Sequence, residues 1–145
     1  MMLETAMLTD NLTYKEVLAE SIQKALGQTT FSNRMMIAPR RLRQIGAEEV
    51  ESVLAYFQNQ DRSAVIQHGH RLAGEGLGRG SVFSLCTALR RACWEAQATD
   101  KAPVLFDLTE EYTTSFLEGY LQGLEEEIRQ EQERTRQAYI RSLEK

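Results

Sequence analysis

Two histidines, His68 and His70, are the side chains in this sequence best suited to chemistry near neutral pH, and they are the only histidines in its 145 residues. A neutral imidazole is a competent nucleophile near pH 7 and a common ligand of haem iron. Either histidine is therefore a candidate phosphoacceptor or ligand contact. The plainer interpretation is a structural histidine that faces a neighbouring helix.

The residues around His70 resemble those of histidine phosphotransfer domains. Residues 70–74, His-Arg-Leu-Ala-Gly, followed by Gly80, are similar to the signature of that family. In it, an exposed histidine on a four-helix bundle accepts phosphate from a response regulator. The resemblance implies His70 as the acceptor. The chain departs from the family at Ala73, where a lysine is usual, and in the glycines that follow.

A haem-binding globin sensor is a second alternative, because several amphipathic helices with one inward histidine could form a globin. Only one expected helix carries histidines, so no pair of axial histidines from two helices is available. The run from Gly74 to Gly80 holds four glycines in seven positions and follows a helix rather than a strand, which indicates a turn and not a phosphate loop. We therefore expect no cofactor.

The remaining side chains give no sign of an enzyme or a metal centre. Cys86 and Cys93 lie seven residues apart on one expected helix, roughly 10 Å apart along its axis, which is too far for a disulfide. We interpret them as buried small hydrophobes. The sequence has no Gly-x-Ser-x-Gly, His-Glu-x-x-His or Cys-x-x-Cys motif, so neither catalysis nor metal binding is expected.

The composition of the chain excludes several other classes of protein. The chain is 42% hydrophobic and 26% charged with a net charge of −4, values typical of one folded domain rather than a disordered chain or a basic nucleic-acid binder. No window approaches the roughly 18 uncharged apolar residues of a membrane span. The N-terminus has no secretory signal pattern, so a cytoplasmic location is expected. The basic cluster Arg34, Arg40, Arg41 and Arg43 precedes Glu48, Glu49 and Glu51, which suggests a locally neutralised, solvated face.

Apolar residues recur at helical spacing almost throughout, so the sequence predicts an all-α fold of five to six helices. The first expected helix spans Thr13 to Leu26. The second is short, carries residues 35–37, is broken or reoriented at Pro39 and continues its pattern to Gly46. The others span Val50 to Asn59, Asp61 to the glycine run, Ser81 to Thr99, and a long C-terminal segment from about Leu108. Residues 1–12 are expected to be a flexible N-terminus and residues 13–128 the helical domain.

The C-terminal helix is expected to exceed 30 residues and to leave the domain as a connector over residues 129–145. Phe116, Leu117, Tyr120, Leu121, Leu124 and Ile128 form its apolar stripe, whereas residues 129–137 contain no apolar side chain. Leu117, Leu121, Leu124 and Ile128 are the candidate residues for pairing two copies. With Thr135 and Ser142 they make a broken heptad, a weak parallel coiled coil at best.

Most of the chain from about Tyr14 onward is similar to the N-terminal sensory domains of RsbR-type stressosome co-antagonists. The similarity lies in residues 69–93 and in the exit segment 120–134. It implies a haem-free, globin-like, dimeric domain that senses an input and passes it through its C-terminal helix to a STAS or kinase module. The expected function is therefore a non-enzymatic signal-input domain, with a downstream effector and an unidentified small ligand or protein as partners.

Overall fold

A computed structural model of the chain describes residues 11–29, 37–95 and 102–144, and within these ranges it is almost entirely helical with no strand. The elements are α2 (Asn11–Gln28), α4 (Pro39–Asn59), α5 (Arg62–Glu75), α6 (Arg79–Glu95) and α7 (Ala102–Leu143). The predicted all-α fold with a long C-terminal helix is confirmed. Residues 1–10 of the expected flexible N-terminus, and most of the short helix expected near residues 35–37, lie outside the described residues.

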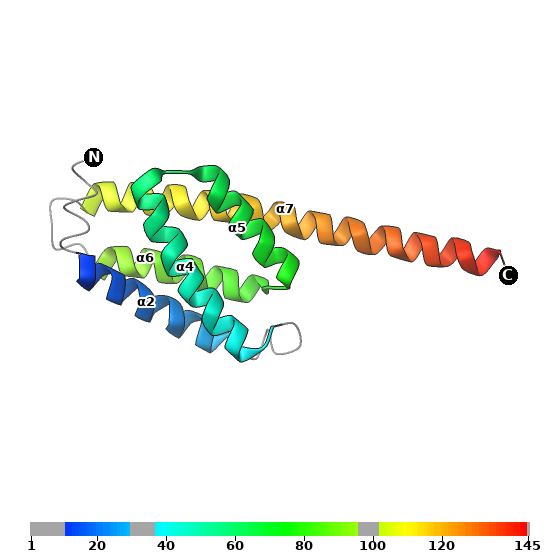
Figure 1. The fold of residues 1–145 in the computed structure, drawn as a ribbon, viewed down its shortest axis with the longest axis horizontal. Helices are drawn as coiled ribbons and strands as arrows, with labels where there is room; N and C mark the ends of the chain where they lie inside the picture. The colour runs from blue at the N-terminus through cyan, green and yellow to red at the C-terminus, as the bar shows by residue number, and fades with distance from the viewer. Residues whose placement is uncertain (1–10, 30–36, 96–101, 145) are drawn as a thin grey trace.

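The helices form a body from which α7 projects (Figure 1). α5 lies along the first half of α7 and makes the most extensive contact with it, while α6 runs antiparallel to α7 on another side. α2 packs against α6 and α4, and α4 crosses the other helices obliquely. The second half of α7 extends away from the body with no other described helix beside it.

The core is apolar and draws on all five helices. Its largest fully buried apolar side chains are Leu18, Ile22, Leu26, Ile45, Val53, Leu72, Leu77, Leu85, Tyr112 and Phe116. Leu77 lies in the turn between α5 and α6, and Tyr120 of α7 donates its hydroxyl to the Leu77 carbonyl at 2.5 Å. The core therefore closes around the first half of α7, which is the part of that helix that carries large buried side chains.

Local signals set the ends of α5 as predicted. Asp61 caps its N-terminus, where Oδ1 accepts a hydrogen bond from the Ala64 amide at 3.3 Å. The helix stops at Gly76, whose φ of 95° is left-handed and whose amide donates to the Ala73 carbonyl. The turn is confined to residues 76–78, because Gly74 lies inside α5 and Gly80 inside α6, and both histidines lie on the same short helix.

Four expected boundaries were wrong. α4 is one helix that continues through Gly46, because the missing side chain there leaves room for Gln23 of α2: an added Cβ would lie 2.6 Å from Gln23 Nε2. α6 begins at Arg79, and Ser81 lies inside it with its hydroxyl 2.8 Å from Thr29 Oγ1. α7 begins at Ala102 rather than near Leu108, and α2 begins at Asn11.

The apolar stripe predicted for α7 faces the body only in part. Phe116 and Tyr120 are buried, and Leu117 and Leu124 are partly buried against the core. Leu121 and Ile128 are instead 56% and 53% exposed, and Ile128 lies in the segment of α7 that extends beyond the body. Two of the four candidate pairing residues therefore lie against the core and two face solvent.

Candidate functional site

A buried carboxylate, that of Glu49, joins three helices. Its side chain projects from the apolar face of α4, between Ile45 and Val53, and is fully buried. Glu49 Oε2 lies 2.6 Å from His68 Nε2 of α5, and Glu49 Oε1 accepts a hydrogen bond from the Tyr112 hydroxyl of α7 at 2.5 Å. The interpretation of Glu49 as part of a solvated charged face was wrong. It is the polar centre at which α4, α5 and α7 meet.

The partners of His68 fix its tautomer. Arg71 Nη2 lies 2.9 Å from His68 Nδ1, and since a guanidinium can only donate, Nδ1 accepts and carries no proton. Nε2 therefore carries the hydrogen and donates it to Glu49. The ring is 5% exposed and packs edge-on against Phe116 at a centroid distance of 5.7 Å. His68 is thus a structural histidine with both ring nitrogens engaged, which leaves neither free to hold haem iron.

Tyr112 completes the network from α7. Burial, together with the charge of Glu49 and the hydrogen bond to it, raises the pKa of Tyr112 well above its ordinary value. The phenol therefore stays protonated and remains a donor at all physiological pH values. The Ser52 hydroxyl lies 3.1 Å from the same phenolic oxygen. No buried polar side-chain atom among the described residues lacks a hydrogen-bond partner, so this network is fully satisfied.

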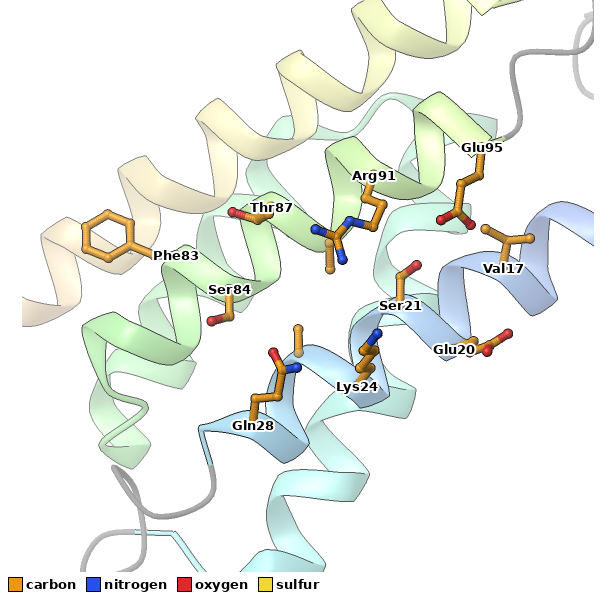
Figure 2. A pocket seen from close by; sticks show the side chains of 12 residues that line it. Val17, Glu20, Ser21, Lys24, Gln28, Phe83, Ser84, Thr87, Arg91 and Glu95 are labelled. Carbon is orange, nitrogen blue, oxygen red and sulfur yellow. The ribbon is translucent and has the colours of Figure 1, made fainter.

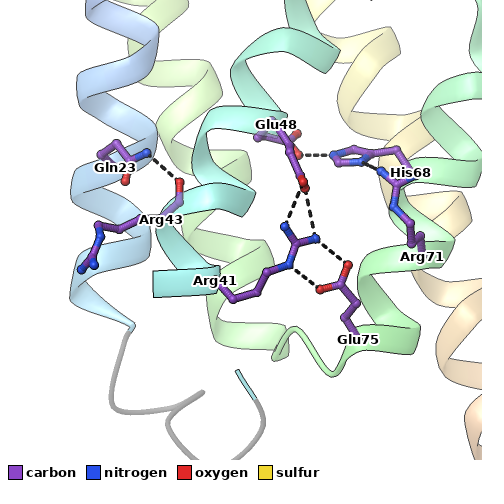
Figure 3. A network of polar contacts seen from close by, with 8 residues as sticks. Gln23, Arg41, Arg43, Glu48, His68, Arg71 and Glu75 are labelled. Carbon is purple, nitrogen blue, oxygen red and sulfur yellow. Dashed lines mark hydrogen bonds and ion pairs between the residues drawn. The ribbon is translucent and has the colours of Figure 1, made fainter. Parts of the chain in front are cut away.

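Arg41 forms a second contact between α4 and α5, close to the first (Figure 3). Its guanidinium makes two hydrogen bonds to Glu75, at 2.8 and 2.7 Å, and two to Glu48, at 2.8 and 3.2 Å. The first turn of α4 is thereby held to the last turn of α5. Local neutralisation, as predicted for the basic cluster, is observed at Arg41.

The pair between Arg41 and Glu75 should make part of the stability depend on pH. The hydrogen bonds from Arg41 lower the pKa of Glu75, so its contribution is present at pH 7 and is lost as the pH falls below 4.5 through the folded pKa. We expect Glu75→Gln to lower the free energy of unfolding by up to about 1 kcal/mol at pH 7, and by progressively less as the pH falls from 4.5 to 3. Urea unfolding across this range measures the difference. An equal loss at both pH values would contradict the ionic origin.

His70 lies on the opposite side of α5 from the Glu49 network. Its side chain is 44% exposed, and its Nε2 lies 2.7 Å from Glu126 Oε2 of α7. This contact is at the point where α7 leaves the body. The ring is accessible, as a phosphoacceptor requires, but Nε2 faces a carboxylate that would have to move away before a phosphoryl group could bind there.

Between the Tyr112–Glu49 contact and the His70–Glu126 contact, α5 and α7 approach so closely that their backbones touch. A Cβ added to Gly119 would overlap the Ile66 carbonyl, and one added to Gly69 would overlap the Phe116 carbonyl. A Cβ on Gly123 would lie 2.6 Å from the Ala73 Cβ. The spacing of Gly119 and Gly123, four residues apart within a helical pattern, is the signal that sequence reasoning missed.

The cysteines behave as the sequence predicted. Cys86 and Cys93 are both buried and unpaired by a disulfide. Burial raises the pKa of Cys86 to about 11 and also raises that of Cys93, which disfavours the reactive thiolate. Among the described residues, no three side chains of His, Cys, Asp or Glu gather as metal ligands do.

Several surface grooves are large enough for a small ligand, including one of about 520 Å³ lined by Tyr56, Arg62 and Glu111. Two further grooves lie against α2 and α4. One, of about 340 Å³, lies between α2 and α6 and is lined mainly by polar and charged side chains, among them Lys24 and Arg91 (Figure 2). The other, of about 420 Å³, lies between α4 and α5. His68, Arg71 and Ser52 line the second groove, so it opens directly onto the buried network around Glu49.

No helix in the described ranges is long and apolar enough to cross a membrane. No family model, curated protein or solved structure matches the chain. The resemblances to RsbR-type sensory domains and to phosphotransfer domains therefore stay predictions.

Proposed function

We propose that this chain is a non-enzymatic signal-input domain, in which a ligand or protein binds the helical body and α7 relays the effect to a downstream effector. The observation that supports this function most is the continuity of α7. One helix of 42 residues is packed into the body over its first half and is exposed from Glu127 onward, with no break between the halves. A continuous helix transmits a displacement because it does not bend easily to absorb it.

The close contact between α5 and α7 gives this relay its mechanism. Because the backbones touch at Gly69 and Gly119, no flexible side chain is available there to absorb a movement of α5. A shift of α5 must therefore carry α7 with it. Tyr112 adds a second route, because it links α7 to the same carboxylate that holds His68 of α5.

The groove between α4 and α5 is the proposed input site. A ligand in this groove would contact Arg71 and His68, which line it, and would compete for their mutual hydrogen bond. Losing that bond leaves His68 Nδ1 without its donor and frees the ring to move, which alters its contact with Glu49. The proposed partners are a second copy of the chain and an effector such as a STAS or kinase module.

The relay is tested by perturbing the hydrogen-bond network around Glu49 and measuring the position of the exposed half of α7. Spin labels are placed at the exposed Gln58 of α4 and Gln137 of α7, and their distance is measured in the full chain with and without Glu49→Gln. Residue 137 lies roughly 21 Å beyond Gly123 along the helix, so a tilt of about 10° moves it by about 4 Å. We expect a shift or broadening of this size.

Glu48→Gln is the matched control, because Glu48 is adjacent, partly exposed and paired with Arg41 outside the network. It should leave the distance between the labels unchanged. If Glu49→Gln folds but leaves the tail where it was, α7 does not report on the body, and a static scaffold would be the better description.

A further inference from the structure

The exposed half of α7 carries its charges in two blocks. Residues 125–133 contain five glutamates and one arginine, a net charge of −4, whereas residues 134–145 contain three arginines, one lysine and one glutamate, a net charge of +3. Two such helices running in the same direction would bring like charges together. Two running in opposite directions would bring the acidic block of each beside the basic block of the other.

The same part of α7 also carries an apolar stripe that nothing in the body covers. Leu121, Ile128, Tyr139 and Leu143 are between 53% and 67% exposed. At about 100° per residue, these four side chains fall within about 60° of one another around the helix axis. Exposed large hydrophobics at such regular spacing mark a surface that packs against another helix.

We propose that two copies of this chain pair through the exposed half of α7 in an antiparallel orientation. The register that fits places Ile128 of one copy opposite Tyr139 of the second copy, and Leu124 opposite Leu143 of the second copy. By symmetry each contact occurs twice. In this register residues 127–140 of the two copies overlap, and residues 141–144 of each helix lie along residues 123–126 of the other.

Individual charges favour the same orientation. In a parallel pair every residue faces its own copy, and continuing the heptad of Leu124 and Ile128 places Glu131 against Glu131 in the interface. In the antiparallel register the acidic block, residues 125–133, instead lies along residues 134–142 of the second copy, which carry only positive charges.

This inference rests on the proposed role of α7 as the output helix, since it names the partner and orientation of that helix. The two proposals fail separately. If the exposed half of α7 moves when the Glu49 network is changed but does not pair, the relay stands and the dimer is ruled out. If the exposed half pairs but does not move with the network, the dimer stands and the relay is ruled out.

Disulfide trapping of the full chain tests the orientation. Ile128→Cys and Tyr139→Cys are made in separate chains, one carrying a tag that changes its mass, and are mixed under mild oxidation. We expect a disulfide between the two variants to form at least tenfold faster than one between two copies of either variant. The wild-type chain reports any background from Cys86 and Cys93, which are buried.

Gln130→Cys and Gln137→Cys are the matched controls, since they lie at nearly the same levels of the helix on its opposite side and are also exposed. They should not crosslink. Like-with-like crosslinks of Ile128→Cys would overturn the antiparallel orientation in favour of a parallel pair. If no crosslink forms at high protein concentration, the pairing itself is overturned, and the apolar stripe would be a binding surface for another protein.

Discussion

Replacing Glu49 by alanine is expected to lower the free energy of unfolding by about 3–5 kcal/mol. The substitution leaves the His68 and Tyr112 donors buried without their common acceptor, and it opens a cavity between α4, α5 and α7. Tyr112 is fully buried and keeps only the Ser52 hydroxyl as a partner, and His68 is 5% exposed. Urea unfolding at pH 7, followed by circular dichroism, measures the loss.

Glu48→Ala is the matched control for this prediction. It removes a glutamate one residue away whose side chain is 42% exposed and whose partner Arg41 also pairs with Glu75. The expected loss is within about 1 kcal/mol, as for other exposed ion pairs. Equal effects of the two substitutions would show that the buried network contributes nothing special to the stability of the body.

Replacing Gly119 by alanine is expected to destabilise the protein by about 2–3 kcal/mol, although alanine is the better helix former. The new methyl group would overlap the Ile66 carbonyl, which is backbone and cannot rotate away. α5 and α7 must then separate along their whole contact. We expect lower thermal stability and faster amide hydrogen exchange in α5.

Gly27→Ala controls for helix propensity, since Gly27 lies in α2 and an added Cβ there meets nothing within 4 Å. It should leave stability unchanged or raise it by up to about 1 kcal/mol. Opposite signs for the two glycines would identify close packing as the cause. A gain in stability from Gly119→Ala would instead mean that α5 and α7 are not in backbone contact.

Much of the fold was predictable because its causes are local. The Asp61 cap and the left-handed Gly76 are set by residues within one helical turn, and both ends of α5 follow from them. Gly46 shows the limit of this reasoning. Glycine is the residue type expected just after a helix end, but the space beside Gly46 is filled by Gln23, which only the packing of α2 brings near.

The candidate site was predictable only in part. His68 was expected to face a neighbouring helix, and it does, but its partner Glu49 was taken for a surface charge because it lies among other glutamates. The apolar residues four positions before and after it, Ile45 and Val53, were the available signal. Tyr112 had no signal of its own, since a tyrosine on an apolar stripe is normally explained by the core.

The sequence by itself determined the all-α class, the ends of α5 and the presence of a long C-terminal helix, because helical periodicity and capping act over a few residues. The tertiary structure decided which charges are buried, which glycines allow backbone contact, and that His70 faces Glu126. These contacts join residues about 20 to 60 positions apart. Their partners are chosen by how helices pack against each other, which no local pattern specifies.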